Sequence, residues 1–310
     1  MYFRHLILIS FKVNLFYFCK LQTLLMIYLI LAILSSSIIF ILFKFFDRYK
    51  ISNIQAITVN YLVAVLSGYF STQENISFQT VIDKPWFNIS VISGMMLMLT
   101  FLIYAFSVQK AGIAITSVLG KMSVIIPVLL GFLMFREKIT WIRISGIIMA
   151  LIAFYLTLQR SSQQKTRIKY LILPILLFFG NGLNDCFFKI AQELYIRNDY
   201  TTFLITAFFI SLVIGFLILM ALVLRKKEKL QFKNIIAGII LGIFNWFATY
   251  LFLVGLSYFD VSVFVPVFSA SIVSIAALTG YFFFREKLSK TNIIGIVLAI
   301  IAIILIAGIE

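Results

Sequence analysis

The 310-residue sequence has little charge, because only 12% of its residues are Asp, Glu, Lys or Arg, whereas 63% are hydrophobic. A soluble globular protein is typically about half apolar and about a quarter charged. A soluble fold of this size could not cover so much apolar surface with so few charged residues. The composition therefore excludes a soluble globular domain and a disordered chain, and it favours an integral membrane protein.

Cysteine and histidine are also scarce. The two cysteines, Cys19 and Cys186, form no CxxC pair, which excludes a disulfide-stapled secreted domain and leaves no spacing typical of metal ligands. The one histidine, His5, lies near the N-terminus. The sequence also contains no HExxH motif, no nucleophile elbow and no phosphate-binding glycine-rich loop. We therefore expect no enzymatic activity, no cofactor and no metal.

The sequence does contain a series of apolar runs, each close to the roughly 20 residues that a helix needs to cross a bilayer. The runs are continuously apolar, which favours helices over the alternating strands of a membrane barrel. We predict an all-α integral membrane protein with ten transmembrane helices. They are expected to cover residues 27–46, 54–71, 87–107, 113–135, 141–158, 169–190, 202–224, 233–257, 261–284 and 291–309.

Residues 1–26 differ from the rest of the chain, because charged side chains interrupt their apolar stretches. Met26 is followed at once by the first uninterrupted apolar run. Our hypothesis is that translation starts naturally at Met26 and that the preceding residues are a mis-assigned N-terminal extension. The alternative is an amphipathic helix that lies in the membrane interface.

The rest of the chain contains an internal repeat, because residues 129–156 match residues 278–305 at a constant offset. The tetrapeptide Phe-Arg-Glu-Lys occurs unchanged in both copies, and small residues that allow close helix packing correspond as well. Thr140 and Ser289 also correspond, and either hydroxyl could cap the following helix. Each half holds five predicted spans. Because five is odd, the second half should be inverted, a frequent design of secondary transporters.

These motifs resemble the EamA family of the drug/metabolite transporter superfamily. FREKIT at 135–140 and FREKLS at 284–289 stand where that family carries a Glu-bearing motif, each before a helix rich in small residues. Arg occupies the position where Gly is commoner in the family. The resemblance covers about 27–309 and implies ten helices in two five-helix repeats, 27–158 and 169–309. It also implies transport of amino acids, other small metabolites or drugs.

Ionisable side chains inside a span cost roughly 2.5–3.5 kcal/mol on insertion scales and usually face a cavity or a partner. Lys121 lies about 12 Å along its predicted helix, too deep to reach the headgroups. We predict that it binds an anionic group of the solute, although a lysine bonded to helix carbonyls or waters is the alternative. Lys44 and Lys189 lie near span ends and can extend to the headgroups.

Asp185 is the acidic residue that lies well inside a span, and it precedes Lys189 by four positions on one helical face. It is the candidate carrier of a coupling proton, although it could simply neutralise Lys189. Besides Lys121, the predicted substrate-binding residues are Asp185, Lys189, Asn181, Asn184, Asn60, Asn245, Trp246 and Tyr250. We interpret Glu137 and Glu286 as structural, each offsetting the positive end of the helix that follows it.

Lysine and arginine concentrate in the odd-numbered loops between consecutive predicted spans, including RKKEK at 225–229. Because cytoplasmic loops are enriched in these residues, we expect the odd-numbered loops in the cytoplasm. Both ends of the ten-helix body would then lie outside. The family resemblance implies cytoplasmic ends instead. Basic loops are typical of membrane proteins, so the net charge of +15 does not indicate nucleic-acid binding. We expect a multi-pass protein of the cell (inner) membrane, in contact with lipids.

The predicted function is a secondary transporter that moves a small metabolite by alternating access. The solute would be amino-acid-like, or another small polar or amphipathic molecule, and a coupling proton is the candidate second partner. A passive channel or a membrane sensor is the alternative function, and an integral-membrane enzyme is a third.

Overall fold

A computed structural model of the chain describes residues 27–72, 78–127, 140–158, 170–196, 200–258 and 261–307, together with Leu129 and Leu133. The elements in these ranges are helical, and the described residues contain no strand. The extension at 1–26 and the first Phe-Arg-Glu-Lys motif, with Glu137, lie outside the described residues. The predicted all-α class is confirmed.

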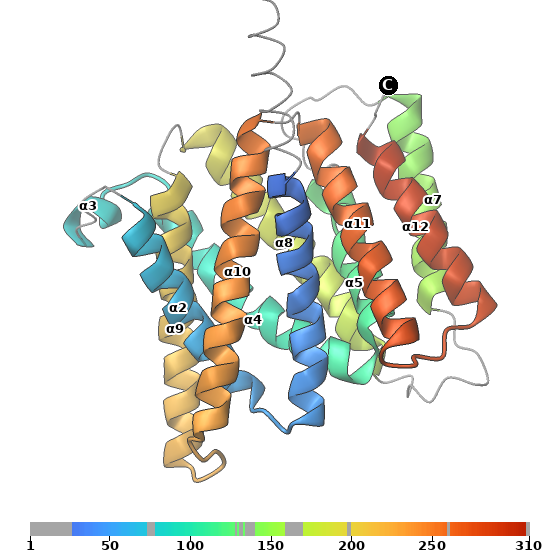
Figure 1. Cartoon of the computed structure of the whole chain (residues 1–310). Coiled ribbons are helices and arrows are strands. Elements are labelled where there is room, and N and C mark those ends of the chain that lie inside the picture. The colour runs from blue at the N-terminus through green and yellow to red at the C-terminus, as the bar shows by residue number, and fades with distance from the viewer. Residues whose placement is uncertain are drawn as a thin grey trace, which may run out of the picture.

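The helices form one bundle (Figure 1), in which the start of the first described helix and the end of the last lie at the same end. The first is the N-terminal helix, Ile27–Arg48. It is followed by α2 (Asn53–Ser71), α3 (Phe78–Ile82), α4 (Phe87–Lys110), α5 (Ile113–Met122), α7 (Trp141–Leu158), α8 (Ile172–Leu194), α9 (Tyr200–Leu224), α10 (Phe232–Tyr258), α11 (Val261–Phe282) and α12 (Lys290–Ala307).

Five of these helices are long and apolar enough to cross a membrane by length and composition. Their apolar parts are Ile27–Arg48, Asn53–Ser71, Phe87–Lys110, Thr201–Leu224 and Phe232–Phe252. α5, α7, α11 and α12 hold shorter apolar stretches. Within the described ranges α8 falls in neither group, because Asn181, Asn184, Asp185 and Lys189 lower its hydropathy. Of the ten predicted spans, five are therefore confirmed as helices long and apolar enough to cross a membrane, and the other five remain a prediction.

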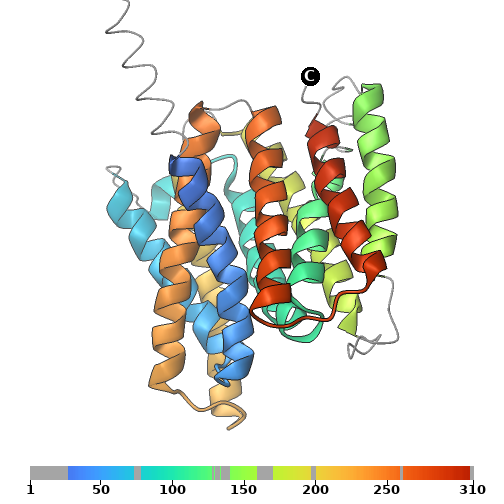
Figure 2. The ribbon, with the colours of Figure 1, turned by 45° about the vertical axis from the view of Figure 1, so that its right-hand side comes forward.

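Helices of the first half pack mainly against helices of the second half. α2 contacts α9 and α10, α4 contacts α8 and α9, α5 contacts α8 and α11, and α7 contacts α12. Figures 1 and 2 show α7 beside α12 at one edge of the bundle and α2 with α9 and α10 at the other. Because the two halves share one packed interior, side chains from both can line the same space.

Small residues bring α7 and α12 close together. A Cβ atom on Gly295 would lie 2.6 Å from Thr157 Oγ1, so only glycine fits at this crossing. Ala153, Ala299 and Ala302 are fully buried in the same apolar cluster. The prediction that the repeated small residues allow close packing is confirmed at this contact.

Ser289 caps α12, as its position before the helix predicts. The backbone N–H of Asn292 donates to Ser289 Oγ at 3.0 Å, and Asn292 Oδ1 accepts from the Ser289 N–H at 3.1 Å. This reciprocal pair satisfies two donors that a helix start otherwise leaves open. The Asn292 amide also donates to the Thr157 carbonyl at 2.9 Å, which ties the start of α12 to the end of α7.

Candidate functional site

α8 carries polar side chains on the face opposite its exposed apolar stripe. The stripe has the three- and four-residue spacing of one helical face and consists of Ile172, Leu176, Phe179 and Leu183. Asn181 and Asp185 are one turn apart and lie nearly on the other side of the helix. Asp185 is nevertheless exposed. Asp185 thus lies exposed on the face of α8 opposite the apolar stripe.

Lys121 reaches the same region from α5. Ile113–Gly120 and Met122 are all buried, and Lys121 is the half-buried exception among the residues of α5. Because the other residues of α5 are buried, the Lys121 side chain cannot extend along a lipid-facing surface to the headgroups. The accessible part of Lys121 therefore also faces the interior, as its predicted depth requires.

Lys121 and Asp185 are near enough for their opposite charges to attract each other. Across the described part of the chain, however, no ion pair within 4.0 Å joins them. The Lys121 ammonium instead lies 4.9 Å from the centre of the Phe268 ring of α11, within the range of a cation–π contact. The ring orients the ammonium but accepts no conventional hydrogen bond, so the N–H donors of Lys121 remain suited to an anionic group.

Three further helices meet beside Lys121. Asn181 Nδ2 of α8 donates to the carbonyl of Gly120 at 3.4 Å. A Cβ atom on Gly120 would lie 3.1 Å from the Tyr104 hydroxyl of α4. The half-buried Tyr104 ring packs edge-on against Phe40 of the N-terminal helix, with 4.9 Å between ring centres. We call Tyr104, Lys121, Asn181, Asp185 and Phe268 the central site.

Two other predicted residues are buried amides. Asn60 of α2 is fully buried, and neither its Nδ2 nor its Oδ1 has a hydrogen-bond partner among the described residues. Asn184 of α8 is also buried, and its Oδ1 lacks a partner within the same ranges. Buried amides usually find partners because an unsatisfied group costs about 1–3 kcal/mol. The described contacts connect neither amide with Lys121 or Asp185.

Three further predicted residues, Asn245, Trp246 and Tyr250, lie on α10. The Trp246 ring packs against Gly68 of α2, since a Cβ atom on Gly68 would lie 3.0 Å from it. The same ring stacks on Tyr250 with 6.2 Å between ring centres. Tyr250 is exposed, and Asn245 is half-buried on the same helix. Trp246 belongs to the same apolar cluster as Phe268, and Tyr104 packs against that cluster. Among the described residues, these contacts include neither Lys121 nor Asp185.

Asp185 and Lys189 occupy successive turns of α8, as their spacing predicts, and Lys189 is half-buried. The charge of Lys121 on α5 also attracts the Asp185 carboxylate. Tertiary packing therefore gives Asp185 an electrostatic partner about 60 positions earlier in the sequence.

Lys44 and Glu286 correct two sequence interpretations. The sequence predicts that Lys44 extends to the headgroups and that Glu286 offsets the helix that follows it. In the structure Lys44 Nζ donates to Glu286 Oε1 at 3.0 Å. Glu286 also accepts the N–H of Ile113 at 2.9 Å, so it caps α5 and not α12. The sequence cannot show this, because the contact forms between the two halves of the chain.

The long apolar helices are those expected of a multi-pass membrane protein. The chain belongs to the EamA-like transporter family, whose sequence profile matches residues 23–159 and 168–308. The profile therefore matches the chain twice, once in each half. Proteins of this family are transporters and not enzymes.

Two individual proteins are similar to the chain. An uncharacterised protein of Haemophilus influenzae is 26% identical over 287 residues, which are 89% of this chain and 95% of that protein. One crystal structure aligns with a TM-score of 0.60 at 14% identity, covering 91% of this chain and 96% of that chain. At that identity the likeness shows the fold alone.

Proposed function

We propose that the protein is a secondary transporter of the cell (inner) membrane and that its central site binds a small amino-acid-like metabolite. One observation carries the proposal: Lys121 and Asp185, from different halves of the chain, lie where α5 and α8 meet, and among the described residues no ion pair within 4.0 Å joins them. Binding sites at the interface between repeats are typical of such transporters.

A zwitterion fits this arrangement of charges. A solute carboxylate would accept hydrogen bonds from the Lys121 ammonium, and a solute ammonium would donate to the Asp185 carboxylate. The Phe268 and Tyr104 rings offer apolar surface beside these two groups. Asp185 is also the carboxylate that we propose to carry a coupling proton, because its charge lies within the transport path.

We propose that the helices complete two five-helix repeats of opposite orientation. Helix packing supports this arrangement. α5 packs on α11, α7 on α12 and α2 on α9, so three helices each contact their own counterpart in the other half. The α2–α10 contact likewise has the α9–α4 contact as its counterpart. A pseudo-two-fold relation between the halves accounts for all four contacts.

Alternating access then requires each end of the repeat interface to open in turn. The Lys44–Glu286 pair holds the N-terminal helix, the start of α5 and the residues after α11 together at one end. We propose that this pair closes that end and that it separates when the site opens there. Lys121 lies about 12 Å further along α5, so movement of α5 would be transmitted to the lysine.

The test is uptake into proteoliposomes that contain the purified protein, with solutes chosen from the metabolites whose levels change when the gene is deleted. We expect Lys121→Gln and Asp185→Asn each to reduce uptake at least tenfold while the variants stay folded. Lys110→Gln and Asp83→Asn, which alter charges at helix ends, are the matched controls and should transport normally. Wild-type rates from folded Lys121 and Asp185 variants would contradict the site.

A second measurement separates a transporter from a channel. Unlabelled solute on the far side of the membrane should accelerate uptake of labelled solute, because the loaded site returns faster than the empty one. Flux that neither saturates nor responds to solute on the far side would indicate a passive channel.

A further inference from the structure

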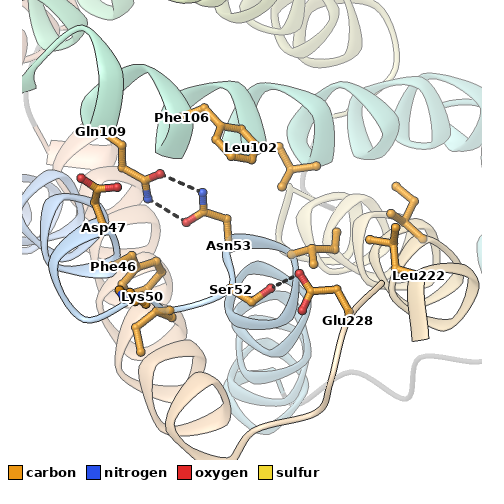
Figure 3. A pocket seen from close by; sticks show the side chains of 13 residues that line it. Phe46, Asp47, Lys50, Ser52, Asn53, Leu102, Phe106, Gln109, Leu222 and Glu228 are labelled. Atoms are coloured by element: carbon orange, nitrogen blue, oxygen red, sulfur yellow. Dashed lines mark hydrogen bonds between the residues drawn. The ribbon is translucent and has the colours of Figure 1, made fainter. Parts of the chain in front are cut away.

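A pocket of about 510 Å³ lies away from the central site, between the ends of four helices. Its lining comes from the N-terminal helix, the start of α2, the second half of α4, the second half of α9 and the loop before α10. Figure 3 shows polar side chains along one side and Leu102, Phe106 and Leu222 along the other. The pocket therefore has an apolar part and a polar part.

The apolar part continues an exposed apolar surface of α4, which we expect to face lipid. The exposed apolar residues Ile92, Met95, Leu99 and Phe106 recur along one face of α4. Phe106 is 44% exposed and also lines the pocket. Closer to the middle of the bundle α4 and α9 are in tight contact, since a Cβ atom on Gly94 would lie 2.5 Å from the Ala207 carbonyl oxygen. The pocket thus lies between the second halves of α4 and α9, which diverge after this contact, and we call this space the wedge.

The polar part is built from fixed side chains. Asn53 and Gln109 exchange two amide hydrogen bonds, at 3.1 and 2.8 Å. Ser52 Oγ donates to Glu228 Oε1 at 3.0 Å, and Gln55 Nε2 donates to Glu228 Oε2 at 2.9 Å. These bonds hold the Glu228 carboxylate in place through neutral donors, and each carboxylate oxygen can accept a further hydrogen bond.

Both signs of charge are present at the polar end. Asp47 and Glu228 are the carboxylates of the pocket lining, and Lys50 is its cation. Asp47 is half-exposed, and its described ion pair, with Lys110, is long at 3.9 Å. Such an exposed pair is weak. The Asp47 carboxylate is therefore available to a ligand cation, and Lys50 to a ligand anion.

We propose that this wedge binds a phospholipid whose headgroup carries a primary amine, as phosphatidylethanolamine does. The ammonium would donate to Asp47 and Glu228, the phosphate would meet Lys50, and an acyl chain would lie along Leu102 and Phe106. A trimethylammonium headgroup has no N–H to donate, and a glycerol headgroup has no positive charge. The pocket therefore distinguishes phosphatidylethanolamine from phosphatidylcholine and phosphatidylglycerol. The proposal is independent of the solute that the central site binds.

The experiment is native mass spectrometry of the purified full-length protein after equilibration with equimolar phosphatidylethanolamine, phosphatidylcholine and phosphatidylglycerol of identical acyl chains. We expect the first bound lipid to be predominantly phosphatidylethanolamine. Asp47→Asn should reduce this preference about tenfold, since a hydrogen bond between charged groups contributes about that factor. Asp83→Asn removes an exposed carboxylate outside the pocket and should leave the preference unchanged.

Filling the wedge tests the acyl-chain part separately. Leu222→Trp should reduce retention of the first phosphatidylethanolamine several-fold, and Phe106→Trp provides a second variant at a more exposed position. Equal binding of phosphatidylethanolamine and phosphatidylcholine by the wild-type protein would overturn the headgroup assignment. Unchanged lipid retention in a folded tryptophan variant would overturn the location.

Discussion

Lys44 and Glu286 are 242 positions apart in the sequence, yet their side chains form an ion pair with 3.0 Å between Nζ and Oε1. Their side chains are only 22% and 12% exposed, so the pair is largely withdrawn from solvent. Glu286 also accepts the Ile113 N–H, and Phe284 packs on Phe45 with 5.5 Å between ring centres. Three helix ends from both halves of the chain are joined at this point.

Removing one partner of this pair should destabilise the protein, because the other charge would remain in a poorly solvated position. We expect Lys44→Met and Glu286→Gln each to lower the free energy of unfolding by about 1–3 kcal/mol. The double variant should lose less than the sum of the two, with a coupling energy of about 1–3 kcal/mol. Denaturant unfolding in detergent micelles measures all three values.

Lys110→Gln is the control for that cycle. Lys110 Nζ lies 3.9 Å from Asp47 and both side chains are well exposed, so its removal should change stability by less than about 1 kcal/mol. Strictly additive losses for Lys44 and Glu286 would contradict a specific pairing.

Gly112 should tolerate no side chain. Its φ of 104° lies in a region that other residues rarely adopt, and a Cβ atom there would lie 2.9 Å from Glu286 Oε2. We expect Gly112→Ala to cost about 1–3 kcal/mol and to lower the unfolding temperature. Ser71→Ala, at the exposed end of α2, should leave that temperature nearly unchanged. An unaltered unfolding temperature for Gly112→Ala would speak against the tight Glu286 cap.

Phe268 should influence solute binding through Lys121. Phe268→Leu keeps an apolar side chain but removes the ring face beside the ammonium, a contact of about 0.5–2 kcal/mol. We expect the transport KM to rise several-fold, while Phe268→Tyr keeps the wild-type value. Phe203→Leu, in the separate cluster around Trp86, should affect stability without changing KM. Equal KM values for the leucine and tyrosine variants would refute this role.

Replacing Asn60 should impair transport without lowering the stability of the fold. Both polar atoms of its side chain are unpartnered among the described residues, so Asn60→Leu should stabilise the fold by about 1–3 kcal/mol. Transport should fall in the same variant if the amide serves the solute path, as the sequence predicts. Asn292→Leu is the contrasting control, because that buried amide is hydrogen-bonded and its loss should destabilise the protein. A stabilised Asn60→Leu protein with normal transport would exclude Asn60 from function.

Features that depend on neighbouring positions could be predicted from the sequence. The Ser289 cap involves Asn292 three positions later, and the glycine and alanine spacing of α12 forms one face of a single helix. Lys121 could also be recognised as an interior residue, because its depth follows from its position along an apolar run. The polar face of α8 that includes Asp185 lowers the mean hydropathy of the helix, so composition marks this predicted span less clearly than it marks the five strongly apolar helices.

Contacts between distant helices could not be predicted in the same way. Phe268 is one of 34 phenylalanines, and nothing in its local sequence distinguishes the ring that lies beside Lys121. Trp246 and Tyr250 have the spacing of one helical face, but only the packing of α10 on α2 shows which surface that face meets.

The sequence by itself determined the membrane class, the two repeated halves, the family and the few charges that lie deep in the chain. These properties depend on composition and on spacing within single helices. Tertiary structure alone decided that Lys44 pairs with Glu286, that Glu286 caps α5, and that Asp185 is attracted by Lys121. The physical reason is that an apolar helix can pack by many of its faces, so the partner of a charge is decided only when the helices assemble.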